Sequence, residues 1–154
     1  MIDIQVTGQP FDPSVEISRL TQADASMGAV VSFIGLMRDI NEGDDVESMT
    51  LEHYPGMTEK SILEILREAT KRWPVQSAAV VHRVGRLCPG EQIVWVGVAS
   101  SHRGAAFAAC EFAMDYLKTR APFWKKEHGP EGECWVDARA SDDTRAARWR
   151  EPKG

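Results

Sequence analysis

The residues best suited to chemistry lie in a short basic segment, Met114–Lys126. Its four cationic side chains are those of Lys118, Arg120, Lys125 and Lys126. The whole chain has a formal net charge of −5, yet no carboxylate lies between Tyr116 and Lys126 to neutralise these cations. Pro122 prevents a helix from running through the segment. The sequence therefore predicts an aromatic-lined bend that holds lysines, as an enzyme needs to bind and polarise an anionic substrate.

A structural role is the simplest alternative for Lys118 and Arg120. Cations at the C-terminus of a helix interact favourably with the helix dipole, which contributes about 0.3–1 kcal/mol each. That role does not account for Lys125 and Lys126, which follow Pro122. A lysine crowded by other cations and by apolar groups is suited to acid–base or nucleophilic work near neutral pH. Both interpretations stay open at this point.

Two other groups of cations lie at the ends of predicted elements. His102 and Arg103 open a predicted helix, where free backbone N–H groups favour an anion such as a phosphate; a solvent-facing pair is the alternative. Arg38 and Arg139 each follow an apolar strand, a position suited to ligand contact.

The distance between two of these groups constrains the site. Arg103 and Lys118 are fifteen residues apart, which is about 22 Å along a helix. One small substrate cannot easily touch both ends from one chain. The sequence therefore predicts either two sites or a symmetric dimer that brings His102 and Arg103 of one subunit to the lysines of the other.

Composition argues against several classes of protein. The isoelectric point near 5.4 is unlike that of a general nucleic-acid binder. We expect no metal, because the three cysteines and four histidines show no spacing typical of metal ligands. Cys110 lies among alanines and is expected in the core. The N-terminus lacks the features of a signal peptide and no run is apolar enough to span a membrane, so we expect a cytoplasmic protein without membrane association.

The hydrophobic pattern predicts mixed strands and helices. We expect strands at 2–6, 28–35, 48–53, 78–84, 92–99 and 133–138, and helices starting at 13 and covering 57–72 and 104–118. Asp12 is the expected N-cap of the first helix, and Ser100 or Ser101 that of the third. A polar loop is expected at 41–45. Strands and helices alternate without regular crossovers, which predicts one α+β domain over 1–154 with a polar tail at about 142–154, and the apolar strands 78–84 and 92–99 should be central.

The chain resembles the large, catalytic subunit of molybdopterin synthase in four segments: GAVVSFIGLMRDINEGDDV (28–46), LEHYPGMTEK (51–60), SSHRGAAFAACEFAMDYLKTRAPFWKKE (100–127) and EGECWVDAR (131–139). The resemblance covers about residues 28–150 and implies an α/β-hammerhead fold with an additional antiparallel β-subdomain. It implies a sulfurtransferase of molybdenum cofactor biosynthesis, which converts cyclic pyranopterin monophosphate into molybdopterin by forming the dithiolene. No cofactor would be permanently bound. Sulfur would come from the C-terminal Gly-Gly thiocarboxylate of a small ubiquitin-like partner, in a heterotetramer built on a homodimer of the large subunit.

The resemblance also implies roles for particular residues. Substrate-binding residues would be Leu36, Met37, Arg38, His102, Arg103, Lys118, Lys125, Lys126 and Glu127. Residues that line or support the pocket would be Phe33, Met114, Phe123 and Arg139. Lys118 would be the central acid–base or transient covalent residue, and Lys125 would assist it by stabilising charge. Met37 departs from the family pattern, which commonly has a smaller β-branched residue at this position.

Two other functions fit parts of the sequence. A non-catalytic subunit could dock a ubiquitin-like protein by β-augmentation and a basic groove, without turnover. A single-stranded nucleic-acid binder could stack bases on Phe123 and Trp124 beside the lysines, although the acidic isoelectric point disfavours it. Trp149, near the C-terminus, could pack against the body of the protein or help to dock a partner.

Overall fold

The computed structural model describes residues 1–22, 24–41, 44–130, 132–136 and 140–150. Its elements, in chain order, are β1 (Ile2–Thr7), α1 (Pro13–Thr21), β2 (Ala29–Leu36), β3 (Ile40–Asn41), β4 (Asp44–Asp45), β5 (Ser48–His53), α2 (Met57–Arg72), β6 (Val75–Arg83), β7 (Gly85–Leu87), β8 (Gln92–Ser100), α3 (Arg103–Arg120), β9 (Phe123–Gly129), β10 (Gly132–Val136) and α4 (Ala140–Ala147). None of the helices described is long and apolar enough to cross a membrane.

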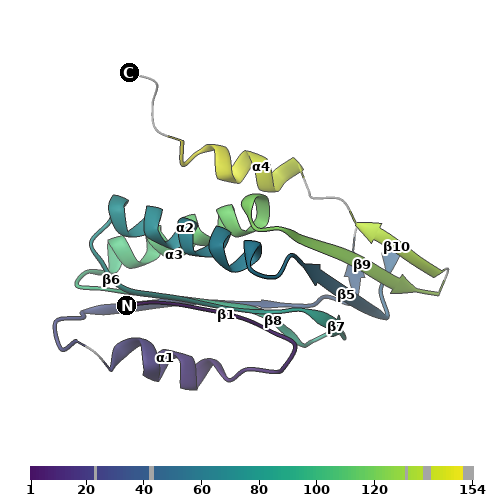
Figure 1. Ribbon diagram of the computed structural model, residues 1–154, viewed down its shortest axis with the longest axis horizontal. Helices are drawn as coiled ribbons and strands as arrows, with labels where there is room; N and C mark the ends of the chain where they lie inside the picture. Colours follow the sequence, from purple (N-terminus) through teal and green to yellow (C-terminus); the bar gives the residue numbers. More distant parts are fainter. Residues whose placement is uncertain (23, 42–43, 131, 137–139, 151–154) are drawn as a thin grey trace.

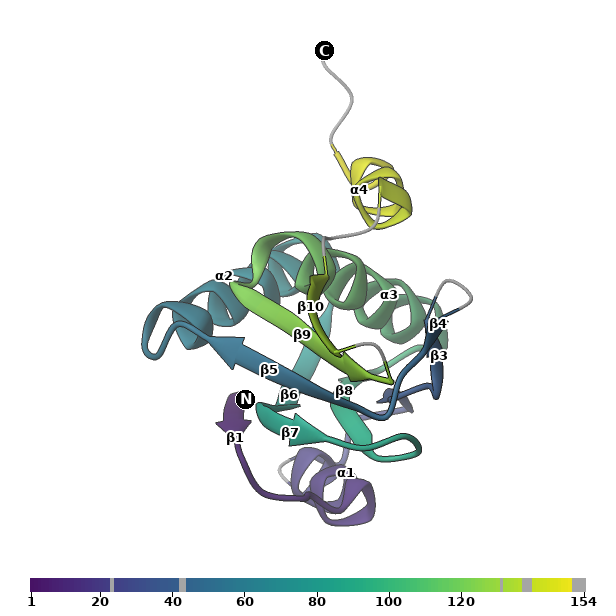
Figure 2. The same cartoon turned by 90° about the vertical axis from the view of Figure 1, so that its right-hand side faces the viewer.

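The larger sheet has the strand order β1-β6-β8-β2, with β1 parallel to β6 and the other pairs antiparallel. Helices α2 and α3 cover one face of this sheet and α1 covers the other (Figures 1 and 2). Alternate residues of β6 therefore enter two different cores: Ala78 and Val80 pack beneath α2 and α3, whereas Ala79 and Val81 pack towards α1. Burial on both faces explains the continuous apolar runs of β6 and β8, and the prediction that these strands are central is confirmed.

A second, antiparallel sheet has the order β10-β9-β5-β7, and β3 pairs with β4. The α+β prediction, with an additional antiparallel unit, is confirmed. Two features of this region were not expected. Ile40–Asn41 and Asp44–Asp45 form a short strand pair where a loop was predicted. The predicted bend lies between the end of α3 at Arg120 and the start of β9 at Phe123, but β9 itself was not predicted. β9 forms because it pairs along its length with β5, from His53 opposite Phe123 to Ser48 opposite His128.

The helix boundaries show which local signals were reliable. Asp12 caps α1 as predicted, since its carboxylate accepts a hydrogen bond from the backbone N–H of Ser14 at 2.9 Å. The bounds of α2 are those predicted. The expected cap of α3 was wrong: the N-cap is His102, without a side-chain bond. Ser100 ends β8 instead, and its hydroxyl donates to the carbonyl of Pro74 at 2.8 Å.

The predicted polar tail contains a helix, α4, which lies over α3 (Figure 1). The buried carboxylate of Asp115 on α3 holds the segment in place, because it accepts hydrogen bonds from Trp149 Nε1 at 2.6 Å, Arg148 at 2.9 Å and Arg145 at 3.1 Å. Burial alone would raise the pKa of Asp115, but these bonds lower it below its usual value. The ring of Trp149 also packs edge-on against Trp73. Trp149 therefore packs against the body of its own chain.

Candidate active site

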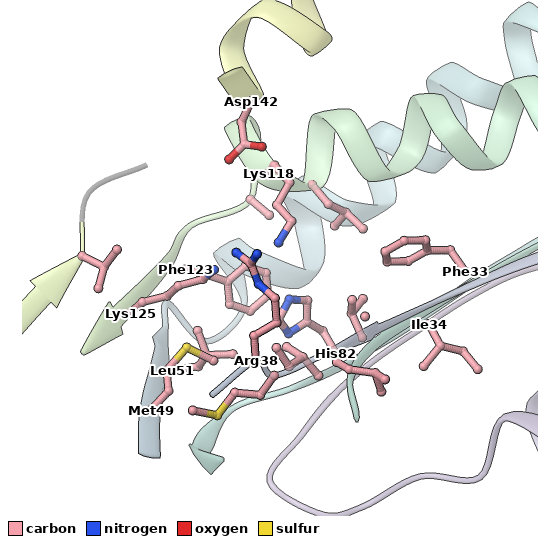
Figure 3. Close-up of a pocket in the computed structure, with 18 of the residues that line it drawn as sticks. Phe33, Ile34, Arg38, Met49, Leu51, His82, Lys118, Phe123, Lys125 and Asp142 are labelled. Carbon is pink, nitrogen blue, oxygen red and sulfur yellow. The ribbon is translucent and has the colours of Figure 1, made fainter. Parts of the chain in front are cut away.

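A cavity of about 560 Å³ lies where the two sheets meet the C-terminal end of α3 (Figure 3). Its walls come from β2, β5, β6, β8, α3, β9, β10 and α4. Eight of the residues expected to form the site line it: Phe33, Leu36, Met37, Arg38, Lys118, Phe123, Lys125 and Glu127. The tertiary structure thus brings three cationic side chains to one cavity, from the loop after β2, from α3 and from β9.

The alternation of β9 decides which of its residues face this cavity. Phe123, Lys125 and Glu127 line it, whereas Lys126 between them points to the opposite face of the strand. There the amino group of Lys126 lies 2.7 Å from Glu133 and 5.5 Å from the ring centre of Trp135. Lys126 therefore does not line this cavity, because the two-residue period of β9 places it on the opposite face of the strand, and its role in substrate binding stays a prediction.

The same alternation separates Phe123 from Trp124. The ring of Phe123 is inside the cavity, and Trp124 is exposed on the outer face of the second sheet. The two rings therefore do not form the continuous stacking platform that a single-stranded nucleic-acid binder would need.

Helix α3 places its two cationic ends far apart. Lys118 in the last turn lines the cavity, whereas the exposed residues His102 and Arg103 at the first turn do not. Met114, one turn before Lys118, packs against the core beneath α2 and α3 rather than lining the cavity. Within one chain the structure thus leaves these three expected residues outside the cavity. Arg139 lies outside the described residues.

Arg38 is positioned by the residue before it. The side chain of Met37 is buried in a small core with Leu51 and Leu87. Its backbone is held at both ends, because its N–H donates to the carbonyl of Glu91 at 2.9 Å and its carbonyl accepts from Gly90 at 2.8 Å. These contacts fix the chain just after β2, so that Arg38 extends into the cavity (Figure 3).

His82 is a cavity residue that the sequence analysis did not identify. Its ring lies 3.9 Å from the ring of Phe123 with an interplanar angle of 17°, and its Nδ1 is 2.8 Å from the carbonyl oxygen of Arg83. Burial, with an additional effect of the positive charges of Lys118 and Lys125, lowers the pKa of His82 to about 4. The imidazole is therefore uncharged at neutral pH. The available signal was a polar residue directly after the apolar run of β6, similar to the position after an apolar strand that identified Arg38.

The titration of His82 makes a prediction about stability. Between about pH 6.5 and pH 4 the unfolded chain takes up a proton at this residue and the folded chain does not, because the pKa is lowered to about 4 on folding. The free energy of unfolding should therefore lose at most about 3 kcal/mol as the pH falls through this range, and the full contribution should be present above it. Urea unfolding at pH 7.0 and about pH 4.5, for the unsubstituted protein and His82→Phe, measures the contribution of His82 to this loss of stability. An equal loss of unfolding free energy in both proteins would contradict the prediction.

Acidic residues lie beside the cations. Asp142, in the first turn of α4, and Glu127 on β9 both line the cavity, and Figure 3 shows Asp142 close to Lys118. Among the residues described, no cysteine lines it, and burial raises the pKa of the Cys110 thiol in the core to about 12. No group of three described His, Cys, Asp or Glu residues could hold a metal ion.

The arrangement can bind an anion and move a proton. Arg38 offers a planar set of N–H donors suited to a phosphate or carboxylate, and the two lysines can stabilise developing negative charge. Phe33 and Phe123 add flat apolar surfaces from opposite sides of the site (Figure 3). The cavity therefore suits an anionic substrate that also carries a ring.

Comparisons with known proteins agree with this chemistry. A family model described as MoaE protein matches residues 6–120. The molybdopterin synthase catalytic subunit of Pseudomonas aeruginosa is 55% identical over 148 residues, which are 96% of this chain and 99% of that protein. The corresponding subunit of Escherichia coli is 56% identical over 146 residues, 95% of this chain and 97% of that protein.

Solved structures give the same result. The molybdopterin biosynthesis MoaE protein from Burkholderia ambifaria has a TM-score of 0.84 and 53% identity, and the match covers 97% of this chain and 98% of that chain. A complex of subunits 1 and 2 of the molybdopterin-converting factor from Helicobacter pylori has a TM-score of 0.68 at 17% identity over 90% of this chain and 91% of that chain, which shows likeness of fold alone. From the near-complete coverage at more than half identity, the chain belongs to the MoaE family of molybdopterin synthase catalytic subunits, enzymes of molybdenum cofactor biosynthesis.

Proposed function

We propose that this enzyme transfers sulfur from the C-terminal thiocarboxylate of a small ubiquitin-like partner to cyclic pyranopterin monophosphate and so forms the dithiolene of molybdopterin. The observation that carries the proposal is the meeting of Arg38, Lys118 and Lys125 in one cavity of a MoaE family member. Each transfer replaces the sulfur of one thiocarboxylate by an oxygen. Two partner chains therefore return as carboxylates for every dithiolene formed, with no oxidant or reductant required.

The cavity residues have distinct roles in this reaction. Arg38 binds an anionic group of the substrate, and Phe33 and Phe123 pack against its ring system. Lys118 acts as the acid–base or transient covalent residue at the reacting carbon, and Lys125 stabilises the negative charge that develops on oxygen and sulfur. Cyclic pyranopterin monophosphate is the substrate, and no permanently bound cofactor takes part.

A sulfur-carrier partner supplies the thiocarboxylate. The partner's extended C-terminal tail is an anion, and the basic cavity suits it in charge. The Helicobacter pylori complex, which shares the fold of this chain, contains two subunits of a molybdopterin-converting factor, and this supports a two-subunit assembly here.

A homodimer completes the cavity in this proposal. Strand β2 lies at the edge of the described sheet and carries exposed apolar side chains: Val30, Phe33, Ile34 and Leu36. It runs from Ala29, which pairs with Ser100 near the start of α3, to Leu36 at the cavity. A two-fold axis near the middle of β2 would therefore place His102 and Arg103 of one subunit beside the cavity of the other. The length of β2, about 26 Å, is close to the length of α3 between these ends.

Shared cavities predict complementation between two inactive variants. Arg103→Ala and Lys118→Ala chains, mixed as a heterodimer, should form one cavity with both lesions and one that is intact. Activity should therefore return to roughly half of that of the unsubstituted dimer. Tagged heterodimers purified away from both homodimers provide the measurement. A heterodimer as inactive as the homodimers would show that each cavity belongs to one chain.

A single-turnover assay tests the function itself. The purified chain, the thiocarboxylated partner and cyclic pyranopterin monophosphate are combined, and the dithiolene product is detected by fluorescence after oxidation. Product that requires the thiocarboxylate supports sulfur transfer. Tight binding of the partner without product, with substrate and thiocarboxylate verified, would instead indicate a docking subunit.

A further inference from the structure

His82 is fixed in one orientation in the cavity wall. It lies near the end of β6, and it follows Ala78 and Val80 on the face of the sheet that packs beneath α2 and α3. Its ring is stacked on that of Phe123 at 3.9 Å, which sets the plane of the imidazole. Its Nδ1 lies 2.8 Å from the carbonyl oxygen of Arg83, which sets the rotation within that plane. Both contacts hold the ring without involving Nε2.

These contacts decide the hydrogen-bonding character of Nε2. A carbonyl oxygen can only accept, so Nδ1 must carry the proton of this bond. In an uncharged imidazole the other nitrogen is then an acceptor, and the lowered pKa of His82 keeps the ring uncharged at neutral pH. The cavity therefore contains a fixed, uncharged acceptor.

The neighbouring cations cannot accept hydrogen bonds from a ligand. Arg38, Lys118 and Lys125 provide N–H donors but no acceptors. They can bind the anionic parts of a ligand, whereas the N–H groups of a heterocyclic ring need nitrogen or oxygen acceptors, which among the lining side chains are Glu127, Asp142 and the uncharged His82. Figure 3 shows His82 below Arg38 and Lys118 and beside Phe123, where a ring bound by these side chains would lie.

We propose that His82 is a substrate-binding residue, whose Nε2 accepts a hydrogen bond from an N–H group of the ring system bound in this cavity. This inference rests on the proposed function, in which the ligand is a cyclic pyranopterin monophosphate whose ring carries several N–H donors. His82 and the cations divide the ligand between them: the cations bind its charge, and His82 binds the edge of its ring. An analogue without ring N–H donors would lose this interaction.

Two substitutions separate hydrogen bonding from packing. His82→Phe keeps a flat ring against Phe123 and removes Nε2, whereas His82→Gln keeps an acceptor at a similar distance from the backbone. The measurement is the Kd of cyclic pyranopterin monophosphate for the full chain in complex with its partner in the carboxylate form, so that no turnover occurs. We expect Kd to increase roughly 10- to 100-fold in His82→Phe and by less than about fivefold in His82→Gln.

Four outcomes would overturn the inference. An unchanged Kd in His82→Phe removes the hydrogen bond to substrate. Equal weakening in both variants, together with equal loss of melting temperature, assigns His82 a structural role. If His82→Phe shifts the pH profile of the single-turnover rate but leaves Kd unchanged, His82 acts on the protonation of Lys118 and does not bind the substrate. Absence of binding or turnover in the unsubstituted complex overturns the proposed function as well. The other three outcomes overturn only the role of His82.

Discussion

Lys118→Ala is expected to lower the single-turnover rate by at least roughly 10³-fold while the chain stays folded. Loss of a proton-transfer group costs about 10²–10⁴-fold, and loss of a group that stabilises developing charge costs about 10²–10³-fold. Lys118 is in a position to supply both, because its side chain extends from the last turn of α3 into the cavity beside Arg38 (Figure 3).

The folding of this variant should be nearly normal. The side chain of Lys118 is exposed, and its interaction with the helix dipole contributes at most about 1 kcal/mol. Lys71→Ala is a matched control, since Lys71 is also an exposed lysine in the last turn of a helix but lies on α2 and does not line the cavity. The rates and the melting temperatures of both variants should be measured together. A near-normal rate for Lys118→Ala would remove this residue from the mechanism.

Gly97→Ala is expected to lower the free energy of unfolding by about 3 kcal/mol. A Cβ atom at this position of β8 would lie 2.3 Å from the indole of Trp95 and 3.1 Å from Leu20. The three residues meet because Trp95 and Gly97 project from the same face of the strand, where α1 packs. The indole cannot move aside, because Trp95 is completely buried. Urea unfolding followed by tryptophan fluorescence measures the loss.

Gly104→Ala makes the same chemical change where there is space. Gly104 is the second residue of α3, and a Cβ atom there would meet no atom within 4 Å. Alanine in place of glycine within a helix should raise the free energy of unfolding by about 0.4–1 kcal/mol. Opposite signs for the two variants would support the packing of Trp95 against Gly97. A Gly97→Ala protein as stable as the unsubstituted chain would contradict it.

Signals that act over a few residues were sufficient for much of the fold. The bounds of α2 follow from its apolar spacing and from Pro74 behind it, and the start of α1 follows from Asp12 and Pro13. The continuous apolar runs of β6 and β8 indicated strands covered on both faces. These features depend on backbone geometry and on the period of side chains along one element, so they are present in the sequence before any packing occurs.

Local signals did not predict the structure where a segment is held by contacts with residues far away in the sequence. No strand was expected directly after Pro122, but pairing with β5 makes this segment the strand β9. Residues near the C-terminus were expected to form a polar tail, but Asp115 and Trp73 hold Trp149 against the body. Hydrogen bonds and buried rings of this kind involve residues more than 30 positions apart, so no short stretch of sequence reveals them.

The sequence by itself determined which residue types were available: a group of lysines after a long helix, an arginine after an apolar strand, and the motifs of the MoaE family. The tertiary structure alone decided which of them meet. It turned Lys125 towards the cavity and Lys126 away, because strand pairing sets which face each residue occupies. It also brought His82 against Phe123, because the two sheets pack together at the end of β6. A site assembled from several elements is defined by packing, and packing depends on the whole chain.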